Sequence, residues 1–140
     1  MIEATFEDIA VAGEGNQFLM LLRTQNDDIL PIVIGHLEAM SIVAGRSKEE
    51  LLRPMSHDLM LSMLDMLNAT VKRIEITDLS EGTFYARLII ENRGVEFELD
   101  ARPSDSLALA VRTDAPLFIA ESVIEQAAMS DMTGSGGAEA

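Results

Sequence analysis

The chain has 140 residues, of which 48% are hydrophobic and 24% charged, a size and composition that fit one globular domain and exclude a wholly disordered or collagen-like protein. Ten Lys and Arg against 24 Asp and Glu give a formal net charge of −14, which repels nucleic acids and anionic membranes at long range. The chain has no cysteine, which excludes disulfides and thiolate metal sites. With no secretory signal and no apolar run near the roughly 20 residues that span a bilayer, we expect a soluble, cytoplasmic protein.

Hydrophobic periodicity predicts an alternation of strands and helices. Strands are expected near residues 4–11, 18–22, 30–34, 69–76, 84–90 and 95–100, and helices near 37–44, 57–67, 105–112 and 121–128. Residues 92–94 (NRG) are typical of a hairpin turn, and Ser56 and Ser104 are expected to be N-caps. We expect a single domain over residues 1–129 and a disordered tail over 130–140, where the sequence is rich in glycine and small residues.

A weak internal repeat underlies this order. Residues 15–23 align with 82–90 at an offset of 67, and the alignment continues without gaps until Glu38 meets Asp105. Upstream, residues 4–11 match 69–76 at an offset of 65. The order of hydrophobic patterns therefore predicts an α+β fold in which a duplicated β-β-β-α-α unit forms one compact, β-rich domain with helices packed on it.

Two regions, a pair of strands and one helix, are more apolar than a simple amphipathic pattern requires. The strands near 18–22 and 30–34 are apolar at both odd and even positions, so we expect both of their faces to be covered, one of them by a second subunit in a homo-oligomer. In the helix near 57–67, an apolar stripe of Leu59, Met60, Met63, Leu64 and Leu67 is expected to face the core, and methionine there is interpreted as core filling.

Two compact polar clusters stand at helix starts and are the candidates for chemistry. The first is residues 53–58 (RPMSHD), and the second is residues 100–105 (DARPSD), with Arg112 two turns further along the same helix. A helix N-terminus beside an arginine suits a phosphate or carboxylate group, whereas an aspartate in the same place can hold a divalent metal or orient a water molecule. The simpler interpretation is that these residues only cap helices and form local salt bridges. The sequence leaves open whether the two clusters meet in space.

At these residues the chain resembles a known family, the bifunctional nuclease domain. The resemblance lies in residues 30–35 (LPIVIG), 53–59 (RPMSHDL), 78–86 (DLSEGTFYA) and 100–106 (DARPSDS). It implies an α+β fold built from a duplicated β-rich unit, and nuclease activity toward DNA and RNA.

On this resemblance we expect a hydrolase that binds nucleic acid weakly and locally. The catalytic candidates are His57, Asp58 and Asp105, the candidates for binding the substrate phosphate are Arg53, Arg102, Ser104 and Arg112, and a divalent metal such as Mg²⁺ or Mn²⁺ would be held by Asp58, Asp105 and Glu38. No organic cofactor is expected. The alternative, which the net charge of −14 favours, is a non-catalytic oligomeric module that binds an anionic ligand or another protein.

Overall fold

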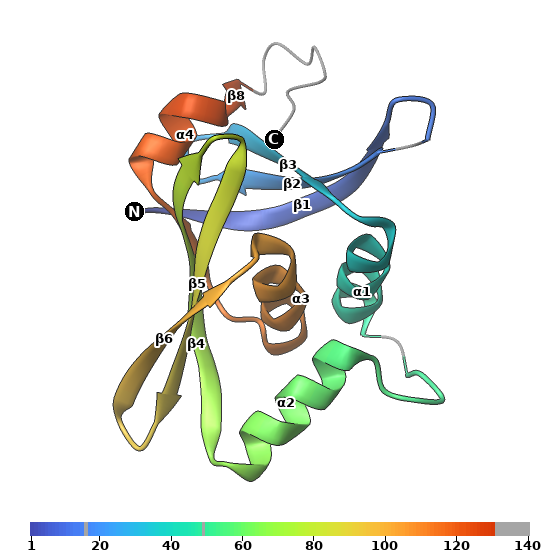
Figure 1. The fold of residues 1–140 in the computed structure, drawn as a ribbon, viewed down its shortest axis with the longest axis vertical. Helices are drawn as coiled ribbons and strands as arrows, with labels where there is room; N and C mark the ends of the chain where they lie inside the picture. Colours follow the sequence, from blue (N-terminus) through green and yellow to red (C-terminus); the bar gives the residue numbers. More distant parts are fainter. Residues whose placement is uncertain (16, 49, 131–140) are drawn as a thin grey trace.

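The computed structural model describes residues 1–130 except residues 16 and 49 and shows the expected α+β fold (Figure 1). The elements in chain order are β1 (Ile2–Ala12), β2 (Gln17–Thr24), β3 (Asp28–Ile34), α1 (His36–Ser47), α2 (Ser56–Met66), β4 (Ala69–Ser80), β5 (Thr83–Asn92), β6 (Val95–Ala101), α3 (Pro103–Thr113), β7 (Leu117–Ile119), α4 (Glu121–Ala127) and β8 (Met129–Ser130). Beyond Ser130, the predicted tail lies outside the described residues.

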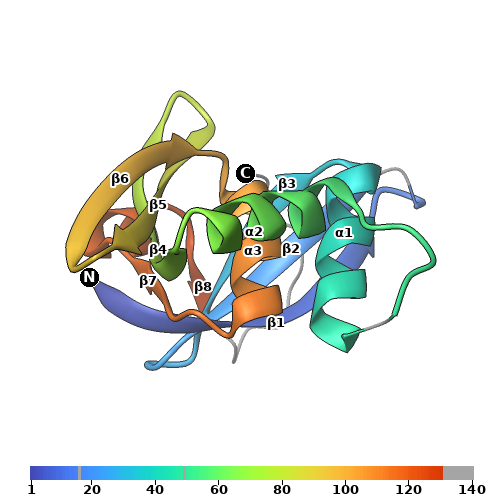
Figure 2. The same ribbon diagram turned by 90° about the horizontal axis from the view of Figure 1, so that it is seen from below.

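Eight strands form one sheet in the order β6-β5-β4-β7-β1-β2-β3-β8. Each half of the chain contributes an antiparallel meander, β1-β2-β3 or β4-β5-β6. The short strand β7 joins them, antiparallel to β1 and parallel to β4. Helices α1, α2 and α3 lie together on one side of the sheet (Figure 2), and α3 packs against both α1 and α2.

The element boundaries can be compared with the expected repeat. The offset of 67 places β3 on β6 and the first residue of α1 on the first residue of α3. The second half departs from the predicted β-β-β-α-α order because β7 lies between its two helices. Descent of the two halves from one duplicated unit stays a prediction.

The start of each of the two motif helices differs from the prediction. The N-caps are Met55 and Arg102, so Ser56 and Ser104 lie inside the first turn, and the prediction that they are N-caps is wrong. In α3 the cause is Pro103, whose fixed φ suits the first helical position. In α2 the carboxylate of Asp58 accepts a hydrogen bond from the backbone N–H of Met55 at 2.8 Å and replaces a hydroxyl cap. The β5–β6 turn is as expected, with Arg93 and Gly94 both at positive φ.

The core fills the space between the sheet and the helices packed on it. Its most deeply buried large side chains are Met20, Leu22, Leu30, Ile42, Ile74, Ile76, Ile89, Ile119 and Val123. Strands β2 and β3 bury residues of both parities within the chain, which confirms that both of their faces are covered. These strands therefore offer little free apolar surface to a second subunit.

The apolar stripe of α2 does not face the core, and that prediction is wrong. The only buried residue of α2 is His57, while Leu59, Met60, Met63 and Leu67 are exposed. Periodicity identifies an apolar face but not what covers it, and α2 lies at the outside of the helical layer (Figure 2).

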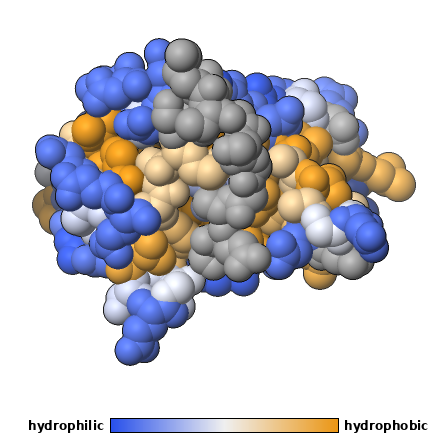
Figure 3. All heavy atoms as spheres, turned by 90° about the horizontal axis from the view of Figure 1, so that it is seen from above, coloured by the Kyte–Doolittle hydropathy of each residue, from blue (hydrophilic) through white to orange (hydrophobic). Residues whose placement is uncertain are grey.

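Figure 3 shows the molecule from above, the direction opposite to that of Figure 2. In that view hydrophilic residues gather around the periphery and apolar residues lie nearer the middle (Figure 3). No helix in the described part of the chain is long and apolar enough to cross a membrane.

Candidate functional site

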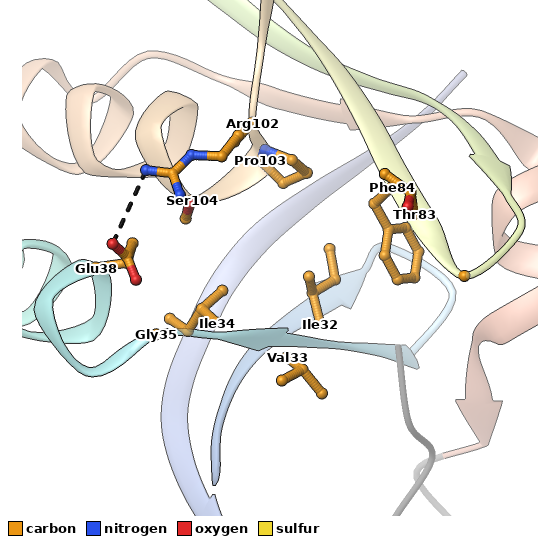
Figure 4. A pocket seen from close by; sticks show the side chains of 11 residues that line it. Ile32, Val33, Ile34, Gly35, Glu38, Thr83, Phe84, Arg102, Pro103 and Ser104 are labelled. Atoms are coloured by element: carbon orange, nitrogen blue, oxygen red, sulfur yellow. Dashed lines mark ion pairs between the residues drawn. The ribbon is translucent and has the colours of Figure 1, made fainter.

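Helices α1 and α3 begin side by side, and one arginine lies between their first turns. Glu38 and Asp105 are the third residues of the two helices. Arg102, the N-cap of α3, places Nη2 3.9 Å from Oε2 of Glu38 (Figure 4) and Nε 2.9 Å from Oδ2 of Asp105. A second hydrogen bond of 3.2 Å joins Arg102 Nη2 to Asp105 Oδ1. One guanidinium group therefore holds two carboxylates that align with each other at the sequence offset of 67.

The first cluster reaches the same carboxylate through His57, in the first turn of α2. The imidazole Nε2 lies 2.9 Å from Oδ1 of Asp105, and Nδ1 lies 2.7 Å from Oγ of Ser41. The two sequence clusters thus meet at Asp105. Sequence reasoning missed Ser41, whose only signal is its place one helical turn after Glu38, on the same side of α1.

Asp105 and Arg102 each stabilise the charged form of the other. Burial raises the pKa of Asp105, but hydrogen bonds from Arg102 and His57 lower it by more, so the pKa lies below its ordinary value. The hydrogen bonds that Arg102 donates to Asp105 in turn raise the pKa of Arg102. Asp105 is therefore ionised and Arg102 protonated at neutral pH.

Two clefts lie on either side of the Glu38–Arg102 pair, and both residues line both clefts. The first, here the Phe84 cleft, has a volume of about 580 Å³ and an apolar wall of Ile32, Ile34 and Phe84 (Figure 4). The second, here the His57 cleft, has a volume of about 630 Å³ and is lined by residues that include Leu37, Met40, Ser41, His57, Met60 and Asp105. Arg102 is the cationic group at the boundary, and its side chain is 64% exposed.

Ser104 and Arg53 have different surroundings. Ser104 is 6% exposed and lines the Phe84 cleft, and its hydroxyl makes no hydrogen bond with any described residue. It lies in the first turn of α3, where backbone N–H groups have no partner within the helix. Arg53 is exposed in the connection between α1 and α2, and its side chain has no ion pair with the described part of the chain. Phosphate binding by Arg53 stays a prediction.

Asp58 of α2 and Arg112 of α3 form a separate ion pair. Arg112 Nε donates to Oδ1 of Asp58 at 2.8 Å, which is the main cause of the lowered pKa of Asp58. Arg112 also donates to the carbonyl oxygens of Ser41 and Ala108 and to Sδ of Met55, which occupies four of its five N–H donors. Its side chain is only 7% exposed. This pair ties α2 to α1 and α3. Phosphate binding by Arg112 and a catalytic role of Asp58 stay predictions.

The predicted metal ligands each face an arginine. Glu38 and Asp105 lie against Arg102, and both carboxylate oxygens of Asp58 are taken by Arg112 and the Met55 N–H. Over residues 1–130 without residues 16 and 49, no group of three or more His, Asp or Glu side chains is placed to hold a metal ion. Metal binding by Asp58, Asp105 and Glu38 stays a prediction.

Comparison with known proteins covers nearly the whole described chain. The model of the bifunctional nuclease domain matches residues 20–132. A protein of unknown function from Mycobacterium tuberculosis (strain H37Rv) is 40% identical over 130 residues, which is 92% of this chain and 77% of the relative. Bifunctional nuclease 1 of Oryza sativa subsp. indica is 26% identical over 97 residues, and bifunctional nuclease 1 of Arabidopsis thaliana is 25% identical over 94 residues. The matched parts are 67% and 65% of this chain, but only 29% of each plant protein. The chain belongs to the bifunctional nuclease domain family.

Proposed function

We propose that the protein hydrolyses phosphodiester bonds of DNA or RNA at Arg102, between the Phe84 cleft and the His57 cleft. The family match and the plant relatives named bifunctional nucleases support this proposal. The observation that carries it is the position of Arg102, an exposed guanidinium that belongs to both clefts and is held by the ionised Asp105.

The groups around Arg102 suit a phosphate. Its Nε and Nη2 donate to Asp105, whereas Nη1 makes no hydrogen bond with any described residue. The hydroxyl of Ser104, which has no partner among the described residues, lies beside it, as does the N-terminus of α3. Such a set of donors favours an anion. The substrate phosphate would bind at Nη1 of Arg102 and the hydroxyl of Ser104.

The clefts suit the groups that flank a phosphate in a single strand. Their volumes of about 580 and 630 Å³ fall within the range of about 300–1,000 Å³ that is usual for small-ligand sites. The apolar wall of Ile32, Ile34 and Phe84 offers a surface for an unpaired base, which needs no extended basic face. A local site of this kind is compatible with the net charge of −14.

In the proposed reaction a water molecule attacks phosphorus, the bond to the leaving oxygen breaks, and the leaving oxygen takes a proton from solvent. Asp105 is the ionised group that orients the water and accepts its proton. Both ring nitrogens of His57 already have partners, so His57 acts through Asp105 as a positioning residue. Assistance by Mg²⁺ or Mn²⁺ and a cytoplasmic location stay predictions.

A second candidate function is binding of an anionic ligand without catalysis. The observation that favours it is charge: Glu38 and Asp105 together outweigh Arg102, so the site does not attract a polyanion strongly. A small ligand with one anionic group would need only Arg102, Ser104 and one apolar cleft.

Cleavage of labelled single-stranded DNA and RNA by the purified chain tests the proposal, in EDTA and with Mg²⁺ or Mn²⁺. We expect Arg102→Ala and Asp105→Asn to lower the rate by roughly a hundredfold or more. Arg87→Ala is the matched control, because Arg87 is an exposed arginine that pairs with Glu98 elsewhere on the sheet. Wild-type protein without activity in all three conditions would contradict the proposal, and stabilisation by a mononucleotide without cleavage would favour the second candidate.

A further inference from the structure

The charges around Arg102 suit one phosphate and disfavour a row of them. Among the described residues, Arg102 is the one Lys or Arg that lines either the Phe84 cleft or the His57 cleft. Glu38 lines both clefts and Asp105 lines the second, so one positive group faces two negative groups. The site can neutralise a single phosphate, and each further phosphate nearby would be repelled.

The position for that phosphate is built into the start of α3. Ser104 is 6% exposed and lines the Phe84 cleft, yet its hydroxyl has no hydrogen-bond partner among the described residues. A nearly buried hydroxyl without a partner costs free energy that an anionic oxygen of a ligand would recover. With Nη1 of Arg102 and the N-terminus of α3, this hydroxyl makes one compact anion site.

Each cleft adds apolar side chains on its own side of the anion site. In the Phe84 cleft these are Ile32, Ile34 and Phe84 (Figure 4). In the His57 cleft they include Met40 and Met60, which are 49% and 40% exposed. The volumes of about 580 and 630 Å³ are each those of a small-ligand site rather than of a long groove. This arrangement matches two bases on either side of a single phosphate.

Beyond the two clefts the chain offers little to a longer strand. Glu81 directly precedes Gly82 of the Phe84 cleft and is exposed, so a strand that continued past this cleft would meet a further carboxylate. Arg53 directly precedes Pro54 of the His57 cleft and is exposed, but one arginine offers a place for one terminal phosphate. Every added nucleotide also brings a negative charge to a protein of net charge −14.

We propose that the preferred substrate is a dinucleotide, in which one phosphodiester group joins two nucleosides, rather than an internal bond of a long strand. This inference rests on the proposed hydrolysis at Arg102 and narrows its substrate class. The phosphate binds at Nη1 of Arg102 and the hydroxyl of Ser104, and one base lies in each cleft. Water attacks phosphorus, one P–O bond breaks, and the leaving oxygen takes a proton from solvent. The products are one nucleoside and one nucleoside monophosphate.

The test compares a dinucleotide with a single strand of roughly 20 nucleotides of the same base, in both ribose and deoxyribose forms. The quantity measured is kcat/KM per phosphodiester bond. We expect the dinucleotide value to exceed the strand value by roughly threefold or more at low ionic strength. Raising the ionic strength from roughly 0.02 to roughly 0.3 M should raise the strand value about threefold, because salt screens the repulsion, and should change the dinucleotide value less.

The outcomes separate this inference from the proposed function. A strand cleaved at least as fast per bond as the dinucleotide at low ionic strength would overturn the inference and leave the proposed function in place. A strand value that falls as salt is added would do the same, because it would indicate attraction rather than repulsion. Cleavage of neither substrate would overturn the proposed function and the inference with it.

A charge variant locates the repulsion at the site. Glu38→Gln removes one negative charge beside Arg102, and we expect it to raise the ratio of strand to dinucleotide cleavage about threefold at low ionic strength. Glu125→Gln is the matched control, because Glu125 is an exposed acid on α4 that lines neither cleft. The control changes the net charge equally and should leave the ratio unchanged. Equal ratios in the two variants would reject repulsion at the site.

Two substitutions test whether both clefts hold a base. Thr83→Trp narrows the Phe84 cleft and Met40→Trp narrows the His57 cleft, and both positions are exposed, so the fold tolerates the larger side chain. We expect each to raise KM for the dinucleotide about tenfold, because each displaces one base. Val11→Trp, at an exposed position of β1 outside both clefts, should leave KM unchanged. A raised KM in only one cleft variant would show that one nucleoside is bound and would overturn the inference.

Discussion

The imidazole Nε2 of His57 lies 2.9 Å from Oδ1 of Asp105, although the two residues are 48 positions apart. This contact joins the start of α2 to the start of α3. It brings the two polar clusters of the sequence to one carboxylate, and Arg102 holds the other side of that carboxylate. The consequences for activity and stability can be measured separately.

Replacing Ser41 by alanine should lower kcat by about tenfold and leave KM nearly unchanged, because the lost hydrogen bond to Nδ1 frees the ring of His57 without touching the phosphate site. The control is Ser47→Ala, an exposed serine on the same helix. A kcat of Ser41→Ala equal to that of the wild type would show that this contact is only structural.

Replacing Arg112 by methionine should lower the free energy of unfolding by about 3 kcal/mol, because it leaves the partly buried Asp58 and two buried carbonyl groups without their donor. Urea unfolding measures the effect. The double variant Arg112→Met/Asp58→Asn should lose less stability than the two single variants added together. Arg87→Met, which breaks an exposed pair, should cost no more than about 1 kcal/mol, and an equal loss there would contradict the interpretation.

Gly45→Ala should destabilise the protein, although alanine ordinarily gains about 1 kcal/mol over glycine inside a helix. A Cβ at Gly45 would lie 2.5 Å from Nη1 and 3.0 Å from Cγ of Arg112, which would push the guanidinium from its partners. In the Arg112→Ala background the same substitution should recover the ordinary gain. Thermal unfolding of the four proteins decides this, and a stabilised Gly45→Ala in the wild-type background would refute the packing argument.

Stability should fall in acid, because the folded protein lowers the pKa of both Asp58 and Asp105 below the ordinary value of 3.8. A carboxyl whose pKa is lowered by folding stabilises the protein above its unfolded pKa, and this contribution is lost as the pH falls below about 4 and through the folded value. Urea unfolding at pH 7, 4 and 3 measures the loss. Asp58→Asn/Asp105→Asn should show a smaller dependence over this range, and an unchanged dependence would assign the effect to other acids.

The local structure followed from short-range signals in the sequence. Alternation over residues 95–100 predicted an amphipathic strand, and Arg93-Gly94 predicted the turn before it, because side-chain period and backbone φ are set by neighbouring residues. The polar clusters were recognisable for the same reason, since the first turn of a helix favours particular residue types. The exact N-cap residues could not be recognised from the sequence, because Pro103 and the Asp58 carboxylate took the role expected of serine.

The partners of those residues were decided only by the tertiary structure. Asp58 and Asp105 stand in similar sequence settings, yet Asp58 pairs with Arg112 and Asp105 with Arg102 and His57. Ser41 joins the site through the packing of α1 beside α3, and α2 has an apolar face that nothing in the described chain covers. A sequence pattern determines which side of an element is apolar or charged. The packing of elements distant in the chain determines what that side meets.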